Sequence, residues 1–308
     1  MKEKVKAVLW SRQFRLVFSG VLLFLAFRKI DVAELWRGLG QVPVWFVGAM
    51  IVYSSVGVLA AGIRWSFLVL EKPKWQDFWI FTKAAYLGMF YSLFLSSSAG
   101  GDLLKWVPLQ RKYPDLSRLT LAGGVVLDRM VGFSAFVVFA FGALILGKLV
   151  NFEFPSILFW LFLGLFSLVI GFYAVVLFLD VEAFLLKLPW GEKIVKMAGV
   201  IRLGNKKRMM IAFGVSLVFQ FIWSLPVWFY SMIFGAGLSL LSVYVFVPVI
   251  NLILILPISV GGWGAREQLF LYFFSGIGTS NERILLASAF GGVLGVATSL
   301  LGGLMLLF

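Results

Sequence analysis

The residues best suited to chemistry in this sequence are an arginine and a glutamate that lie side by side within a long apolar run. Arg266 and Glu267 follow a stretch, residues 256–264, that contains one proline and three glycines. A guanidinium group binds phosphate or carboxylate bidentately, and glycines such as Gly261 and Gly262 let the backbone approach a ligand with free N–H groups. The pattern indicates an anion site. A structural Arg–Glu pair that joins two arms of a hairpin is the alternative, and the two roles are compatible.

A second break in the apolar pattern lies about half a chain earlier, at residues 96–102. Its candidate binding residues supply small donors and one carboxylate: Ser98, Gly100, Gly101 and Asp102. Because such residues before a helix commonly act as caps, Asp102 as the N-cap of an amphipathic helix at 103–109 is the alternative. Lys105, about one turn further on, is either a phosphate contact or the partner of Asp102.

Asp128 and Arg129 form the third candidate group, because they lie inside an apolar run at 119–146. The nine residues of this run that precede them make about 14 Å of helix. Charges at that depth in a membrane are costly and mark a functional site by default. Neighbouring helical residues point about 100° apart, so these two cannot simply neutralise each other. We expect Arg129 to reach Asp102, Glu267 or a ligand.

Lys83 and three tryptophans lie near the ends of apolar runs. Lys83 is the last candidate for substrate binding, and extension of its ammonium group to the nearby interface is the alternative. Trp45, Trp65 and Trp79 are interpreted as anchors at the membrane interface, where their amphipathic rings are enriched.

The composition indicates an all-α polytopic membrane protein. Hydrophobic residues make up 61% of the 308 positions and charged residues only 13%, a balance typical of membrane helices. The alternating pattern of an outer-membrane barrel is absent. Without Cys or His, thiol chemistry, histidine relays and the common zinc and haem sites are excluded, and no cofactor or metal is expected. The net charge of +13 is assigned to cytoplasmic loops that face anionic lipid rather than to nucleic-acid binding.

The distribution of charge predicts six full spans and two re-entrant hairpins. If every apolar run crossed the membrane, the basic loop at 111–118 would lie outside, against the positive-inside rule. Hairpins at 78–109 and 240–275 instead place the strongly basic loops and both termini on the cytoplasmic side of a prokaryotic inner membrane. The expected full spans are residues 16–27, 43–63, 119–146, 156–179, 209–234 and 284–308.

Each half of the chain has the same predicted order: a span, an amphipathic segment, a span, a hairpin and a span. Because three full spans are an odd number, the second repeat, 151–308, should be inverted relative to the first, 1–150. One hairpin then enters from each face, and the two tips meet near the middle of the membrane. The Arg–Glu pair of the second tip should face the carboxylate of the first tip and the Asp–Arg helix across a polar cavity.

Three motifs together resemble the transmembrane family of lysylphosphatidylglycerol synthases, over nearly the whole chain. They are Ser-Ala-Gly-Gly-Asp at 98–102, Leu-Asp-Arg at 127–129 and Leu-Pro-Ile-Ser-Val-Gly-Gly-Trp-Gly-Ala-Arg-Glu at 256–267, the most specific of the three. The first departs from the family pattern, since Ser96 or Ser97 stands where a proline is expected. The resemblance implies a flippase-like protein that translocates lipid. Because the aminoacyl-transferase domain of the fused members is not in this sequence, synthesis of lysylphosphatidylglycerol is not expected.

The leading hypothesis is a lipid transporter that is independent of ATP or coupled to ions, since the sequence has no nucleotide-binding motif. Arg129 and Arg266 would contact the phosphate of an anionic phospholipid or a polyprenyl-phosphate lipid, with the nearby carboxylates positioning these cations. A membrane lipid is the expected partner, and the choice between monomer and homodimer is open. The alternatives are an intramembrane enzyme that acts on a lipid phosphate and a non-transporting assembly subunit. Only carboxylates and serines could serve as a base or nucleophile, so enzyme activity is not expected.

Overall fold

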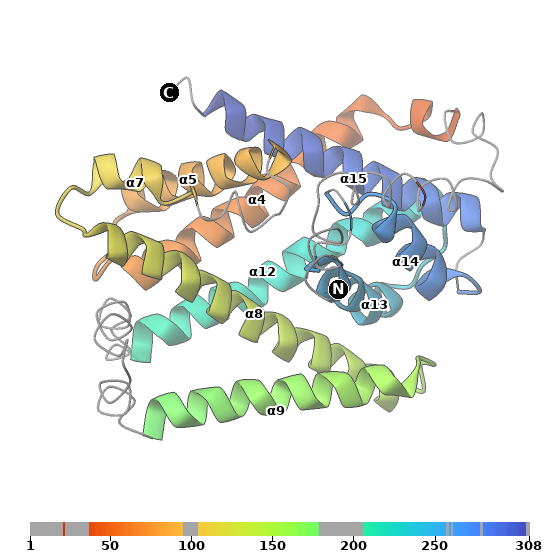
Figure 1. The fold of residues 1–308 in the computed structure, drawn as a ribbon. Coiled ribbons are helices and arrows are strands. Elements are labelled where there is room, and N and C mark those ends of the chain that lie inside the picture. The colour runs from red at the N-terminus through yellow and green to blue at the C-terminus, as the bar shows by residue number, and fades with distance from the viewer. Residues whose placement is uncertain are drawn as a thin grey trace, which may run out of the picture. The chain divides into compact units, whose positions relative to one another are not determined.

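The computed structural model describes residues 37–94, 104–178, 206–256, 261–277 and 280–305, together with Val21 and Ser259. Nearly all of the predicted first span, the whole first hairpin tip at 96–102 and most of the loop at 180–208 lie outside the described residues. The helices, labelled in Figure 1, are α4 (Val44–Val69), α5 (Trp75–Phe94), α7 (Val107–Lys112), α8 (Arg118–Leu149), α9 (Ser156–Phe178), α12 (Lys206–Ile233), α13 (Leu240–Leu254), α14 (Ala265–Phe274) and α15 (Asn281–Leu304).

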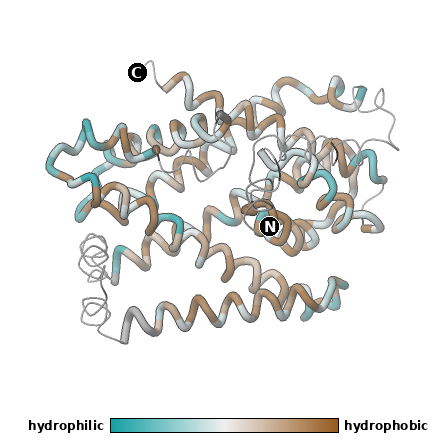
Figure 2. Tube along the Cα trace, in the orientation of Figure 1, coloured by the Kyte–Doolittle hydropathy of each residue, from teal (hydrophilic) through white to brown (hydrophobic). Residues whose placement is uncertain are grey.

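The all-α polytopic prediction is confirmed, since every regular element in the described ranges is a helix. Five of them, α4, α8, α9, α12 and α15, are long and apolar enough to cross a membrane. They coincide with five of the six predicted spans, and the sixth is the first span. Figure 2 shows apolar residues along these helices and polar residues at the connection between α7 and α8.

Two boundaries differ from the prediction for physical reasons. The second span was expected to end at Arg64, but α4 continues to Val69, because the Arg64 side chain finds a buried partner inside the protein. The short helix expected at 103–109 is instead α7, which has a proline in its first turn, where no helical N–H is needed. Arg111 and Lys112, expected in a loop, occupy the last turn of α7, where the helix dipole favours cations.

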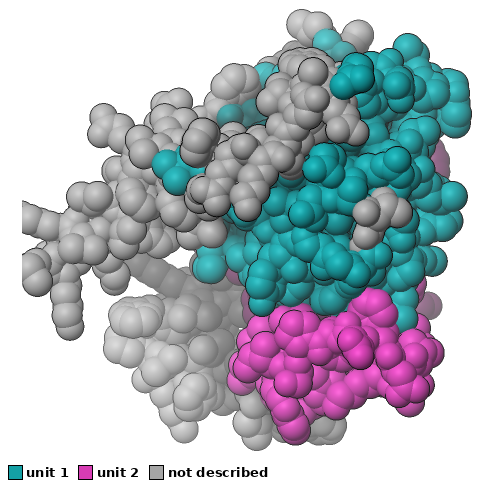
Figure 3. Space-filling model, turned by 90° about the vertical axis from the view of Figure 1, so that its right-hand side faces the viewer, with its two compact units in different colours: residues 1–55, 89–101, 222–308 teal, residues 56–88, 102–221 magenta. Residues whose placement is uncertain are grey.

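The described chain forms two compact units, which Figure 3 distinguishes by colour. The first comprises residues 1–55, 89–101 and 222–308, and the second comprises residues 56–88 and 102–221. Three of the helices, α4, α5 and α12, contribute one part to each unit.

The core of the second unit lies around Trp65, which is 0% exposed and packs edge-on against Phe81 with ring centroids 4.9 Å apart. Of the three tryptophans predicted as interface anchors, this one was therefore assigned wrongly, whereas Trp45 and Trp79 are exposed. Within this unit α4 also approaches α5 closely, because Gly62 lies directly against the backbone of Thr82. Helices α8 and α9 pack on each other after a short turn.

The start of α5 and the end of α7 lie next to each other. The Tyr113 hydroxyl, just after α7, donates a hydrogen bond of 2.5 Å to Asp77, in the first turn of α5. Burial and then the carboxylate of Asp77 raise the pKa of the Tyr113 phenol, so the phenol stays protonated and able to donate. At the same end of the unit, Arg208 near the start of α12 donates to the carbonyl oxygen of Leu70 at the end of α4, at 2.7 Å.

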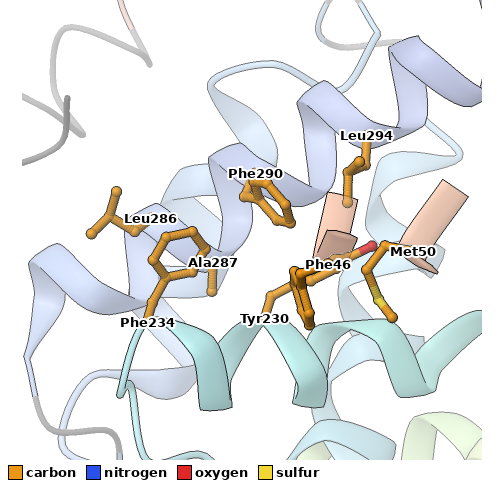
Figure 4. Packing of buried hydrophobic residues seen from close by; sticks show 8 residues of the cluster. All are labelled: Phe46, Met50, Tyr230, Phe234, Leu286, Ala287, Phe290 and Leu294. Carbon is orange, nitrogen blue, oxygen red and sulfur yellow. The ribbon is translucent and has the colours of Figure 1, made fainter. Parts of the chain in front are cut away.

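The first unit is organised around Phe290 of α15, as Figure 4 shows. Its ring lies 5.3 Å from that of Tyr230 on α12, 5.5 Å from that of Phe234 just after α12, and 6.1 Å from that of Phe46 on α4. The full cluster comprises Phe46, Met50, Tyr230, Phe234, Leu286, Ala287, Phe290 and Leu294. Aromatic pairs of this geometry add to the hydrophobic gain and hold these helix segments together.

Helices α13 and α14 form a hairpin within the first unit. They are 15 and 10 residues long, about 22 and 15 Å, so neither alone matches a hydrocarbon core of about 30 Å. Phe246 of α13 stacks on Phe273 at the far end of α14, with centroids 5.2 Å apart, so the two helices run antiparallel. The turn between them carries the glycine-rich motif.

Candidate functional site

Three glycines with positive φ form the turn at the start of α14. Gly261, Gly262 and Gly264 have φ of 60°, 81° and 80°, a region that residues with a side chain rarely adopt. A methyl group on Gly262 would also lie 3.1 Å from Nη2 of Arg266. The glycines of this motif therefore serve both to turn the chain and to make room for the arginine.

The Arg266 guanidinium lies inside this turn. Its Nη2 donates to the carbonyl oxygen of Gly261 at 3.1 Å, and its Cζ lies 5.6 Å from the ring centroid of Trp263. On the side of α15, a methyl group on Gly292 would lie 2.5 Å from Nη1 of Arg266 and 2.9 Å from the Trp263 ring. The arginine is thus held by a carbonyl, an aromatic ring and a glycine face, and no carboxylate of the described residues lies within 4.0 Å of it.

Glu267 has partners of its own. It is 0% exposed, and its Oε2 accepts the backbone N–H of Gly264 at 2.7 Å, which completes a capping interaction at the start of α14. Ser288 of α15 donates to its Oε1 at 3.4 Å. Glu267 therefore stabilises the turn that presents Arg266 and ties this turn to α15.

The second charged centre is Asp128 of α8, which lies in the second unit and is 2% exposed. Its Oδ1 accepts from Nε of Arg64 at 2.6 Å, and its Oδ2 accepts from Nζ of Lys105 at 2.9 Å. Lys105 also lies 4.6 Å from the ring centroid of Trp65. This one carboxylate links α4, α8 and the chain just before α7. In a buried site the ionised groups are tolerated only because they are paired.

The face of α8 that meets α4 is shaped for this cluster. Gly124, Asp128 and Gly132 follow at intervals of four residues, so they lie in one row along the helix. A methyl group on Gly124 would collide with Val69, and one on Gly132 would lie 3.0 Å from Nη1 of Arg64. Small residues let the backbones of membrane helices approach closely. Here Gly132 also leaves the space that the Arg64 side chain occupies.

Arg64 is the site residue that the sequence reasoning missed. It was taken as the boundary of a span, although the apolar chain continues to Leu70 beyond it. That continuation is the signal that could have identified Arg64 as a charge within a helix. Its partner, 64 positions away, carries no local signal.

The other predicted residues are distributed as follows. Arg129 is exposed on α8, next to the buried Asp128. Lys83 is exposed on α5 and forms no ion pair or hydrogen bond with a described residue. Ser98, Gly100, Gly101 and Asp102 lie outside the described residues, and the meeting of the two hairpin tips stays a prediction. In the described ranges, no three acidic side chains gather in a way that could hold a metal ion.

Comparison with known proteins agrees with the motif resemblance. The family model described as the lysylphosphatidylglycerol synthase TM region matches residues 12–303, nearly the whole chain. No curated protein and no solved structure matches it. The match and the five apolar helices show a lipid-related, multi-pass membrane protein. The chain belongs to the lysylphosphatidylglycerol synthase transmembrane region family.

Proposed function

We propose that this protein transports a lipid with a phosphate-bearing headgroup across the cytoplasmic membrane, without covalent chemistry. The observation that carries the proposal is the position of Arg266. Its guanidinium contacts Gly292, the twelfth of the 24 residues of α15. Eleven residues, or about 16 Å of helix, separate Gly292 from the start of this candidate span, which is about half the hydrocarbon thickness.

A cation at that depth needs an anion or a wet cavity. The closest contacts of Arg266 are neutral, namely Gly261 and Trp263. Glu267 acts on it electrostatically, but no carboxylate of the described residues lies within 4.0 Å of it. A phosphate group is the anion that a guanidinium fork binds best, and lipid headgroups bring phosphate to the membrane. The left-handed turn supports the same role, because it holds the guanidinium in place before a ligand arrives.

The predicted re-entrant hairpins supply a route by which headgroups from both faces could reach mid-depth. The bond between Tyr113 and Asp77 supports the first hairpin, because its two ends could not meet if the segment crossed the membrane. The lengths and antiparallel packing of α13 and α14 support the second. With the bond between Arg208 and Leu70, several basic segments gather at one end of the second unit, as expected for a cytoplasmic face.

Arg266→Ala is expected to lower the rate of lipid transport at least about tenfold, since a charge-assisted hydrogen bond is worth about 1.5–3 kcal/mol. Gly292→Ala should also slow transport, because the added methyl group displaces Arg266 and Trp263. Gly295→Ala, in the same helix but with nothing within 4 Å of the added group, is the matched control and should behave like the wild type. The measurement is flipping of a panel of fluorescent lipids in reconstituted vesicles.

Unchanged transport in a well-folded Arg266→Ala variant would contradict the role of this residue. Arg129→Ala, measured in parallel, tests the second predicted phosphate contact. Headgroup turnover is followed in detergent with the same lipids, because release of a headgroup fragment would favour an enzyme over a transporter. Wild-type protein that neither flips nor cleaves any lipid of the panel would favour an assembly subunit.

Single cysteines are expected to label according to the hairpin topology, and the native chain has no Cys to interfere. Lys72→Cys and Asp115→Cys should both react with an impermeant maleimide from the cytoplasmic side, although the segment from α5 to α7 lies between them. Glu153→Cys and Ile277→Cys should both react from the outside. Labelling of Asp115→Cys on the face opposite to Lys72→Cys would refute the first hairpin, and opposite faces for the other pair would refute the second.

A further inference from the structure

Arg64 is a buried arginine that uses only part of its hydrogen-bonding capacity. It is 7% exposed, and its Nε donates to Oδ1 of Asp128 at 2.6 Å. Within the described part of the chain, its terminal nitrogens Nη1 and Nη2 make no hydrogen bond. Neither nitrogen is among the fully buried polar atoms that lack a partner, so both keep some solvent-accessible surface. A buried guanidinium with unused N–H groups is costly unless something binds it, since charged donors lose more than neutral ones when unpaired.

Contacts around Arg64 fix the orientation of the two terminal nitrogens, Nη1 and Nη2, which form the unused fork of the guanidinium group. Its Cζ lies 5.6 Å from the ring centroid of Phe219, and Nη1 lies against Gly132 of α8. Because Nε of Arg64 donates to Asp128, the outer edge of the guanidinium group, which carries Nη1 and Nη2, faces away from the carboxylate. Lys105 holds the other oxygen of Asp128, which keeps the carboxylate from rotating.

A second cation lies near this fork. Arg129, the next residue along α8, repels the Arg64 guanidinium electrostatically. An anion bound by the terminal nitrogens of Arg64 would accept their unused N–H groups and would be attracted by both positive charges. A planar fork of this kind matches the spacing of two oxygens of a phosphate group.

We propose that Arg64, positioned by Asp128, is a further anion-binding residue, and that its ligand is an oxyanion of the phosphate class. Arg64 and Asp128 belong to the second unit, whereas the Arg266 turn belongs to the first. The inference rests on the proposed function in one respect, namely that a lipid phosphate supplies the anion. Binding and transport are therefore measured separately, so that each proposal can fail without the other.

The test uses the purified full chain in detergent and isothermal titration calorimetry with three probes. These are short-chain phosphatidylglycerol, inorganic phosphate, and a diacylglycerol with the same acyl chains but no phosphate. Gly132→Ala is the key variant, because its methyl group would lie 3.0 Å from Nη1 of Arg64 while every charge is kept. Gly142→Ala is the matched control on the same helix, with nothing within 4 Å of the added group. Arg64→Lys keeps the charge beside Asp128 but removes the fork.

Gly132→Ala and Arg64→Lys are expected to weaken phosphatidylglycerol binding about tenfold or more, with Gly142→Ala unchanged and diacylglycerol binding equal in all variants. Unchanged phosphatidylglycerol affinity in both Gly132→Ala and Arg64→Lys would overturn the proposal. Loss confined to inorganic phosphate would overturn the lipid source and identify a site for free phosphate. A wild type that binds as expected but flips no lipid would count against the proposed function alone.

Discussion

Asp128→Asn is expected to destabilise the protein by about 3–5 kcal/mol, the usual cost of breaking a buried ion pair by removing one partner. Asparagine has nearly the same shape as aspartate, so the change removes charge without creating a cavity. Arg64, which the carboxylate now binds at 2.6 Å, would be left buried without this counter-charge, and Lys105 would lose the ionised oxygen that it now binds at 2.9 Å. The midpoint of thermal unfolding in detergent should fall by on the order of 10 °C.

Asp115→Asn provides the matched control for this experiment. Asp115 is exposed between α7 and α8 and forms no ion pair with a described residue. Surface substitutions of this kind change stability by about 0.5 kcal/mol or less. Equal melting temperatures for Asp115→Asn and Asp128→Asn would show that the cluster does not hold α4 and α8 together.

Gly62→Ala is expected to destabilise the protein by about 3 kcal/mol, at the upper end of the range for overpacking. The added methyl group would lie 2.7 Å from the backbone nitrogen and 2.8 Å from the Cα of Thr82, in addition to contact with its side chain. Backbone atoms cannot move aside as a flexible side chain can, so α4 and α5 would have to separate. Because Trp65 and Phe81 pack at this contact, the core of the second unit would loosen too.

Gly48→Ala is the control within the same helix. Nothing lies within 4 Å of the group that it adds, and alanine favours a helix over glycine by about 1 kcal/mol. We therefore expect effects of opposite sign, a lower melting temperature for Gly62→Ala and an unchanged or higher one for Gly48→Ala. Truncation of Thr82 to alanine in the Gly62→Ala background should not restore stability, since the obstacle is backbone. Full recovery in that double variant would disprove this explanation.

Much of the architecture could be predicted because hydropathy and charge are local signals. Long apolar runs gave the positions of α8, α9, α12 and α15 to within a few residues. Each such helix satisfies its own backbone hydrogen bonds, as the membrane requires, so no knowledge of neighbours was needed. The glycines in the stretch at 256–268 similarly indicated a special turn, and all three of them adopt positive φ.

The partners of the charged side chains could not be predicted in the same way. The sequence showed that Asp128 needs partners, because an ionised group in an apolar helix is costly, but only the tertiary structure decided that Arg64 and Lys105 supply them. Trp65 is a tryptophan near the end of an apolar run, as an interface anchor would be. It is nevertheless buried, because Phe81 and Lys105 cover it.

The Arg266–Glu267 pair shows most clearly which features depend on the sequence alone and which depend on the tertiary structure. The sequence by itself determined that a guanidinium and a carboxylate lie beside a glycine turn inside a membrane protein. The tertiary structure decided that they act apart: Glu267 caps α14 and contacts Ser288, while Arg266 faces Trp263 and Gly292. The reason is physical, since residue type and spacing are read along the chain, whereas pairing depends on which distant helix faces bring a donor and an acceptor within about 3 Å.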